Sequence, residues 1–185
     1  MKLYAIRHTR VDVKTGICYG KTDVGLAAGY LEHFKLVRKR LPDDLSLKIY
    51  SSPLSRCLKL ARYLFPGAPI ITDKRLTELD FGNWEMQSWD TISQLPLAAK
   101  WFNDYVNTRC PGGESFSDQL LRTGKFLDEL LQIDSTNSIV ITHGGNIRAM
   151  RCLIDHLPAE EAFRHPVEYG ECFCFNLDNI KSINA

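Results

Sequence analysis

The stretch Ile139-Val-Ile-Thr-His-Gly-Gly-Asn-Ile-Arg148 runs from apolar, β-branched residues into a histidine, two glycines and the first turn of a helical pattern. Such a run predicts a buried strand, and the glycines allow a sharp turn into the helix. The start of the chain repeats this order, because the apolar run 2–6 ends at Arg7 and His8. Functional groups gather beyond the carboxyl ends of parallel strands. We therefore expect His8 and His143 on one rim of a sheet, close enough to share a ligand.

The rest of the chain alternates between strand-like and helical patterns. Apolar residues have helical spacing in the segments 29–41, 54–64, 84–106, 117–131 and 146–156. Strand-like runs occur at 48–50, 69–72 and 172–177 in addition to the two named above. This alternation predicts an α/β fold, a three-layer α/β/α sandwich with a mostly parallel central sheet and the last strand added antiparallel at an edge. No repeat or linker divides the chain, so we expect one domain over residues 1–185.

Large aromatic residues cluster between about residues 81 and 114. They are Trp84, Trp89, Trp101, Phe102 and Tyr105. We expect this segment to form a small helical cap over the functional rim. The alternative for most of these aromatic residues is simple packing between helices.

Arg56 is a candidate for the same rim. It follows Lys48-Ile-Tyr-Ser-Ser-Pro-Leu-Ser, in which a strand gives way to a capping serine and a proline suited to the first helical turn. The alternative is a solvated arginine on a helix surface. Gly144 and Gly145 add free backbone N–H groups at a helix N-terminus, which favour an anion. The pattern therefore indicates an anion site between strand ends.

The segment 75–85 contributes carboxylates among large apolar residues. We expect Glu78 to be partly desolvated beside aromatic surface, which raises the pKa of a carboxyl group and lets it hold a proton near neutral pH. Asp80 and Glu85 are interpreted as solvated surface charges.

The composition is that of a soluble intracellular enzyme. The chain has 185 residues, 44% hydrophobic residues and a formal net charge of +1, which argues against general nucleic-acid affinity. We find no signal-peptide pattern and no apolar run long enough to span a membrane. The six cysteines are scattered, so we expect reduced thiols in a cytoplasm.

Metal binding is the main rival chemistry for paired histidines. None of the five histidines lies in a His-Glu-x-x-His pattern, and no cysteines form a Cys-x-x-Cys pair. Neighbouring arginines also disfavour a cation. We therefore predict no metal and no cofactor.

Taken in order, Arg7-His8, Ser52-Pro53 with Arg56, Leu76-Thr-Glu78 with Phe81-Gly82, and Thr142-His143-Gly144 resemble the motifs of the histidine phosphatase (phosphoglycerate mutase-like) superfamily. The resemblance spans almost the whole chain. It implies that His8 is a nucleophile that forms a phosphohistidine, with its other ring nitrogen donating to a backbone carbonyl. It further implies that Arg7, Arg56 and His143 hold the phosphoryl group and that Glu78 is the general acid.

Two variable segments refine this resemblance. Residues 15–23 and 111–115 look like those of α-ribazole phosphatases, which remove the 5′-phosphate of α-ribazole phosphate in cobalamin synthesis. The expected partner is thus a small phosphorylated metabolite, with neither nucleic acid nor membrane involved. Alternatives are a sugar-phosphate or phosphoprotein phosphatase, a phosphoglycerate mutase, or a non-catalytic phosphate-binding domain. Mutases usually have Gly and Glu directly after the first histidine, where this chain has Thr9 and Arg10, which weakens the mutase alternative. Further candidate substrate-binding residues are Gly144, Thr9, Lys14, Tyr19 and Gly20.

Overall fold

The structure of the protein is a computed structural model that describes residues 1–41, 48–133, 137–178, 180 and 182–183. Its centre is a five-stranded sheet with the strand order β3-β2-β4-β1-β5. The strands are β1 (Lys2–Arg7), β2 (Lys48–Ser51), β3 (Ile70–Thr72), β4 (Ser138–Thr142) and β5 (Cys172–Asn176). Neighbouring strands are parallel except β1 and β5, which run antiparallel. The predicted mostly parallel sheet with one antiparallel edge strand is confirmed.

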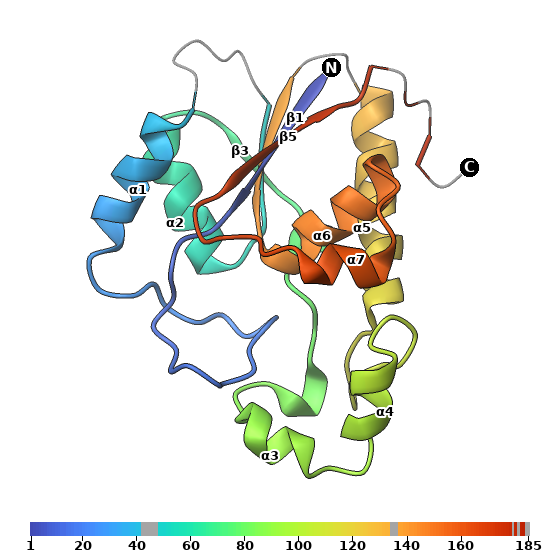
Figure 1. The fold of residues 1–185 in the computed structure, drawn as a ribbon. Coiled ribbons are helices and arrows are strands. Elements are labelled where there is room, and N and C mark those ends of the chain that lie inside the picture. Colours follow the sequence, from blue (N-terminus) through green and yellow to red (C-terminus); the bar gives the residue numbers. More distant parts are fainter. Residues whose placement is uncertain (42–47, 134–136, 179, 181, 184–185) are drawn as a thin grey trace.

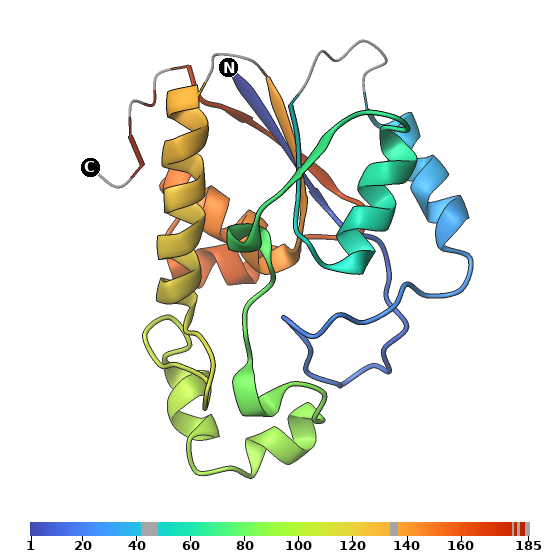
Figure 2. The same ribbon diagram turned by 180° about the vertical axis from the view of Figure 1, so that it is seen from behind.

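Helices cover both faces of this sheet (Figures 1 and 2). One face carries α1 (Tyr30–Lys39) and α2 (Ser55–Leu64), and the other carries α5 (Phe116–Ile133), α6 (Gly144–Ile154) and α7 (Ala159–Arg164). The three-layer arrangement is therefore as predicted, although α7 corresponds to none of the predicted helical segments. Among the helices of the described residues, none combines the length and apolar character needed to cross a membrane.

Strand β4 packs against the helices on both faces of the sheet. All five of its residues are buried. Side chains alternate between the faces of a strand, so Ile139 and Ile141 enter the core beneath α1 and α2, whereas Val140 enters the core beneath α5 and α6. Burial on both faces fixes the carboxyl end of β4, where His143 follows.

The segment 81–114 forms the small helical cap, seen below the sheet in Figure 1. It contains α3 (Trp89–Ser93) and α4 (Ala98–Asn103), and short 3-10 turns occur at Lys74–Leu76 and Gly82–Trp84. Trp84, Ile92 and Ala98 form its core together with Cys18 and Cys110. The loop after β1 is thus packed against the cap through Cys18.

The continuous helix predicted over 84–106 is wrong. Met86 has a φ of 64°, which lies outside the right-handed helical region. Ser88 then caps α3 by accepting a hydrogen bond from the backbone N–H of Thr91. Pro96 lies between α3 and α4, and it has no N–H with which to continue the first helix. The helix-like spacing of the aromatic residues arises because two short helices and the turn before them contribute rings to one cluster.

Candidate active site

His8 and His143 follow the carboxyl ends of β1 and β4, which are paired in parallel. The backbone N–H of His8 donates to the carbonyl of Thr142 at 3.0 Å, which ties the two strand ends together. The centroids of the two imidazole rings are 5.0 Å apart, and the ring planes meet at 65° in an edge-to-face arrangement. Both side chains are buried. The predicted proximity of the two histidines is confirmed.

Both imidazoles are neutral at pH 7. Burial lowers the pKa of His8 well below 6.5, and the nearby His143 and Arg56 lower it further. Burial likewise lowers the pKa of His143, together with the positive charges of Arg56 and Arg122. Each ring therefore keeps one unprotonated nitrogen, whose lone pair is free to accept a hydrogen bond or to act as a nucleophile.

Hydrogen bonding fixes the tautomer of His8. Its Nδ1 lies 2.7 Å from the backbone carbonyl of Thr9, and a carbonyl can only accept, so Nδ1 carries the proton. The lone pair of the neutral ring is then on Nε2. The expected donation to a backbone carbonyl is confirmed, and Thr9 supplies it. His143 Nε2 lies 2.8 Å from the Ser52 hydroxyl.

Two buried arginines flank the histidines. Arg56 is fully buried, and its Nη1 and Nη2 donate to the carbonyls of Thr22 and Gly20 at 2.8 and 2.6 Å. The alternative of a solvated arginine on a helix surface is therefore wrong. Arg7 donates to the carbonyl of Val167, and its Cζ lies 3.9 Å from the centroid of the Tyr169 ring. Within the described residues, the Nε atoms of both arginines are buried without a hydrogen-bond partner.

Glu85 organises the loop that holds Arg56. Its carboxylate accepts hydrogen bonds from the backbone N–H groups of Gly20, Lys21 and Thr22, from the Thr22 hydroxyl, and from the N–H of Phe81. The interpretation of Glu85 as a solvated surface charge is wrong, because the loop donates to both of its oxygens. A Cβ at Gly20 would lie 1.9 Å from the Leu79 carbonyl oxygen, so the loop requires glycine there.

Asp80 also differs from the interpretation as a solvated charge. It accepts from the backbone N–H of Gly82 and pairs with Lys21 at 2.9 Å. It therefore stabilises the start of the cap.

Glu78 is buried, and its environment differs from the expected one. Burial raises its pKa, but hydrogen bonds from the N–H groups of Leu79 and Gly145, the Gln119 amide and the charge of Arg7 outweigh burial and lower the pKa below its ordinary value. The expected rise of the pKa of Glu78 is therefore wrong. Charge-stabilising donors decide the balance here because three of them converge on one carboxylate.

A cavity of about 310 Å³ opens in front of these groups. Its polar lining includes Arg7, His8, Glu78, Gln119 and Arg148. The other lining side chains are mostly aromatic or apolar: Ile17, Tyr19, Leu79, Phe81, Trp89, Phe163 and Tyr169. The cavity therefore offers a ligand both charged or polar groups and apolar surface.

A family model for the histidine phosphatase superfamily (branch 1) matches residues 3–181. The chain belongs to this superfamily. A protein of Hydrogenobacter thermophilus provisionally named phosphoserine phosphatase 2 is 28% identical to this chain. The alignment covers 98% of this chain and 92% of the Hydrogenobacter protein. The adenosylcobalamin/alpha-ribazole phosphatase of Escherichia coli is 24% identical over 92% of this chain and 87% of its own.

A solved structure shares the fold of this phosphatase. The alpha-ribazole phosphatase from Shigella flexneri superposes with a TM-score of 0.87, covering 100% of this chain and 96% of the other at 23% identity. This likeness concerns the fold alone.

The other predicted substrate-binding residues of the phosphatase lie in different places. Tyr19 lines the cavity, and its hydroxyl lies 2.6 Å from that of Tyr169. Gly144 begins α6 behind Arg7. Thr9 lines a separate cavity, and Lys14 is exposed outside this one.

Arg56 and His143 are fully buried and do not line the open part of the cavity. They lie close to His8, whose pKa responds to both.

Several cavity residues, among them Gln119, Arg148, Phe163 and Tyr169, have no role in the sequence analysis. Gln119 and Phe163 are single residues in α5 and α7, and Tyr169 lies in a loop, so no local pattern identifies them. Arg148 lies five residues after His143, in the second turn of α6. A basic residue this close to the start of a helix that begins at the rim could have been predicted from the sequence.

Proposed function

We propose that this phosphatase hydrolyses phosphate monoesters through a phosphohistidine formed on His8. The observation that carries the proposal is the Nδ1–H bond to the Thr9 carbonyl in a neutral ring, which leaves the Nε2 lone pair for phosphorus. In the first step an Nε2–P bond forms as the ester P–O bond breaks, and the leaving oxygen takes a proton. In the second step water attacks phosphorus and the Nε2–P bond breaks.

The phosphoryl group of a monoester carries close to two negative charges at pH 7. Arg7 and Arg56 supply the opposite charge, and each has a buried Nε–H without a partner among the described residues. A guanidinium suits this role because its planar fork matches two phosphate oxygens and stays charged. His143, 5.0 Å from His8, adds one donor.

Glu78 is the proposed source of the proton for the leaving oxygen. Its pKa is lowered below the ordinary value, so it is a carboxylate at pH 7. A dianionic phosphoryl group entering beside it raises that pKa, because like charges disfavour ionisation. Glu78 therefore takes up a proton with substrate, gives it to the leaving group, and accepts one from water in the second step.

The proposed substrate is α-ribazole 5′-phosphate. Phe81, Trp89 and Phe163 offer aromatic surface to a leaving group with an aromatic base, as α-ribazole has. The similarity to an alpha-ribazole phosphatase of E. coli supports the same choice.

Phosphoserine is the second candidate. It is favoured by the 28% identity with the Hydrogenobacter protein and by Arg148, a cavity cation that could hold a carboxylate. A phosphoserine carboxylate would then lie against Arg148 and leave the aromatic wall largely unused.

A substrate panel tests the proposal. Purified protein is assayed with p-nitrophenyl phosphate, α-ribazole 5′-phosphate, phosphoserine, a sugar phosphate and 3-phosphoglycerate, and kcat/KM is compared. We expect turnover of the aryl ester, loss of turnover in His8→Ala, normal turnover in the control His165→Ala, and the highest kcat/KM with α-ribazole 5′-phosphate. No turnover of any ester by the folded protein refutes the phosphatase mechanism. A preference for another ester refutes only the choice of substrate.

A further inference from the structure

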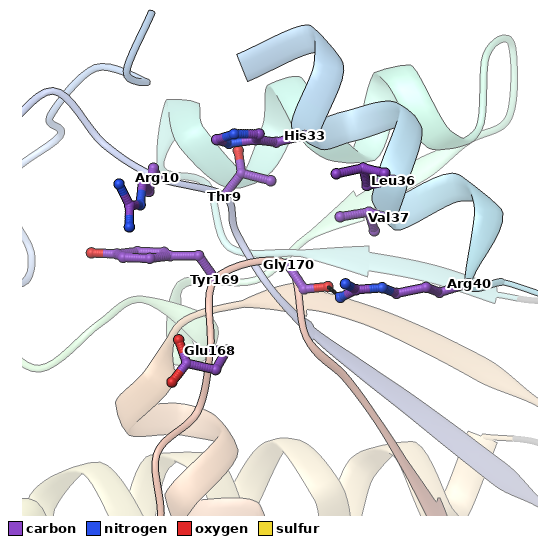
Figure 3. A pocket seen from close by; sticks show the side chains of 9 residues that line it. All are labelled: Thr9, Arg10, His33, Leu36, Val37, Arg40, Glu168, Tyr169 and Gly170. Carbon is purple, nitrogen blue, oxygen red and sulfur yellow. Dashed lines mark hydrogen bonds between the residues drawn. The ribbon is translucent and has the colours of Figure 1, made fainter. Parts of the chain in front are cut away.

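A second cavity lies between α1 and the loops that follow β1 and precede β5 (Figure 3). Its volume is about 220 Å³. A single water needs roughly 10–15 Å³ of such volume, so the cavity has room for a polyatomic ligand. Tyr169 lines this cavity and the catalytic one. The catalytic groups His8 and Glu78 are absent from its lining, so it is a separate site.

The cavity is lined by an excess of basic side chains. Arg10, His33 and Arg40 face it, against the single carboxylate of Glu168. In Figure 3 the Glu168 carboxylate lies below the Tyr169 ring, whereas the Arg10 guanidinium lies above it. The side of the cavity nearest α1 therefore has a positive potential.

The two arginines differ from others in the protein. Arg75, Arg109 and Arg122 each pair with a carboxylate. In the ranges that the structure describes, Arg10 and Arg40 have no such ion pair, and Arg40 makes only a 3.4 Å hydrogen bond to the Gly170 carbonyl. Their charges are thus available to an external anion.

A buried hydroxyl adds a polar contact. Thr9 is 1% exposed, and its Oγ1 has no hydrogen-bond partner among the described residues. Figure 3 shows this oxygen directed toward His33 within the cavity. A buried hydroxyl without a partner is unfavourable, and a hydrogen bond to a ligand oxygen would remove that cost. Gly170 allows the close packing of this wall, since a Cβ there would lie 2.8 Å from Val37 Cγ2.

We propose that this cavity is a second anion-binding site, which takes a small dianionic oxyanion of the phosphate type, free or as part of a small metabolite. Arg10 and Arg40, at opposite ends of the cavity in Figure 3, attract the oxyanion by their charge, and the Thr9 hydroxyl donates to it. The occupant contacts Tyr169, whose ring lies 5.7 Å from that of His8 and 3.9 Å from Arg7 Cζ. The second site therefore shares a wall with the catalytic site.

NMR titration of the ¹⁵N-labelled protein tests this proposal, and the sugar phosphate is added to the His8→Ala protein so that the ester is not hydrolysed. Sodium sulfate, inorganic phosphate, ribose 5-phosphate and malonate are added separately at constant ionic strength. We expect saturable shifts of the Arg10 and Gly170 amides with sulfate, phosphate and the sugar phosphate, and weaker shifts with malonate. Comparison of free phosphate with the ester separates the two sources of the phosphate group.

Arg40→Ala is the test variant and Lys39→Ala is its matched control, since each removes one exposed charge at the C-terminal end of α1 but only Arg40 lines the cavity. Loss of a charge-assisted contact should weaken sulfate binding at Gly170 about tenfold in Arg40→Ala. The control should bind as the parent does, and the Gly145 amide should respond to sulfate equally in all three proteins. Linear shifts without saturation, or equal effects of the two variants, overturn the proposal. Arg10→Ala provides an independent second variant.

Discussion

Glu85→Gln perturbs the catalytic site from a distance. Glu85 does not line the catalytic cavity, but its two oxygens accept five hydrogen bonds, most of them from the loop 20–22. The carbonyls of Gly20 and Thr22 in that loop hold the guanidinium of Arg56. The substitution should therefore displace Arg56 through the loop.

The hydrogen bonds set the expected magnitude. One oxygen accepts from Lys21 and Phe81, and the other from Gly20 and Thr22. Glutamine keeps one of these oxygens and presents an NH₂ group in place of the other, so at least two backbone donors lose their acceptor. At about 1 kcal/mol for each lost bond, about 2 kcal/mol is lost. If this energy is taken from the placement of Arg56 in the transition state, kcat/KM falls about 30-fold.

The assay is steady-state hydrolysis of p-nitrophenyl phosphate, with thermal unfolding measured on the same samples. Glu32→Gln is the matched control, because Glu32 is an exposed carboxylate of α1 that pairs only with Lys35 among the described residues. The control should retain full activity. A folded Glu85→Gln protein with unchanged kcat/KM refutes the reasoning. If the unfolding temperature falls and kcat/KM does not change, Glu85 stabilises the loop without positioning Arg56.

Three further predictions concern the catalytic groups. Arg56→Lys should lower kcat/KM by about 100-fold or more despite keeping the charge, because one ammonium cannot hold the carbonyls of Gly20 and Thr22 and also contact phosphate; near-parental kinetics would contradict the bidentate role. Glu78→Gln should lower kcat/KM for alkyl phosphates more than for p-nitrophenyl phosphate, whose leaving group needs little protonation, and equal losses of kcat/KM for both esters would exclude Glu78 as the acid. NMR titration of the His8 ring should give a pKa well below 6.5. Because the unfolded ring takes up its proton near pH 6.5, the free energy of unfolding should fall as the pH drops below 6.5, and a normal pKa for His8 would contradict the buried site.

The sequence was sufficient to predict the layers of the fold and the position of the histidines. Ile139 and Ile141 belong to an apolar run that is buried on both faces, and His143 follows it directly. The run before His8 has the same character, and the two strands pair in parallel. Hydrophobic runs followed by a turn are local signals, so they can be recognised in the sequence without knowledge of tertiary contacts.

The interactions that tune the site depend on contacts between distant segments. Glu78 was expected to have a raised pKa from its apolar neighbours, but Gln119 of α5 and the N–H of Gly145 on α6 donate to it. The local sequence indicates a surface charge for Glu85, because its partners at residues 20–22 are more than 60 residues away. No spacing rule connects such segments, since the connection is made only when the cap packs against the loop.

Direct detection of the phosphorylated residue tests the central mechanism most closely. The protein is mixed briefly with p-nitrophenyl phosphate and quenched in alkali, which preserves the N–P bond, and its peptides are then analysed by mass spectrometry. The mechanism predicts phosphate on His8, in the parent and in the His165→Ala control, and none in His8→Ala. Phosphate on His143 or on another residue, or turnover by His8→Ala, would contradict it.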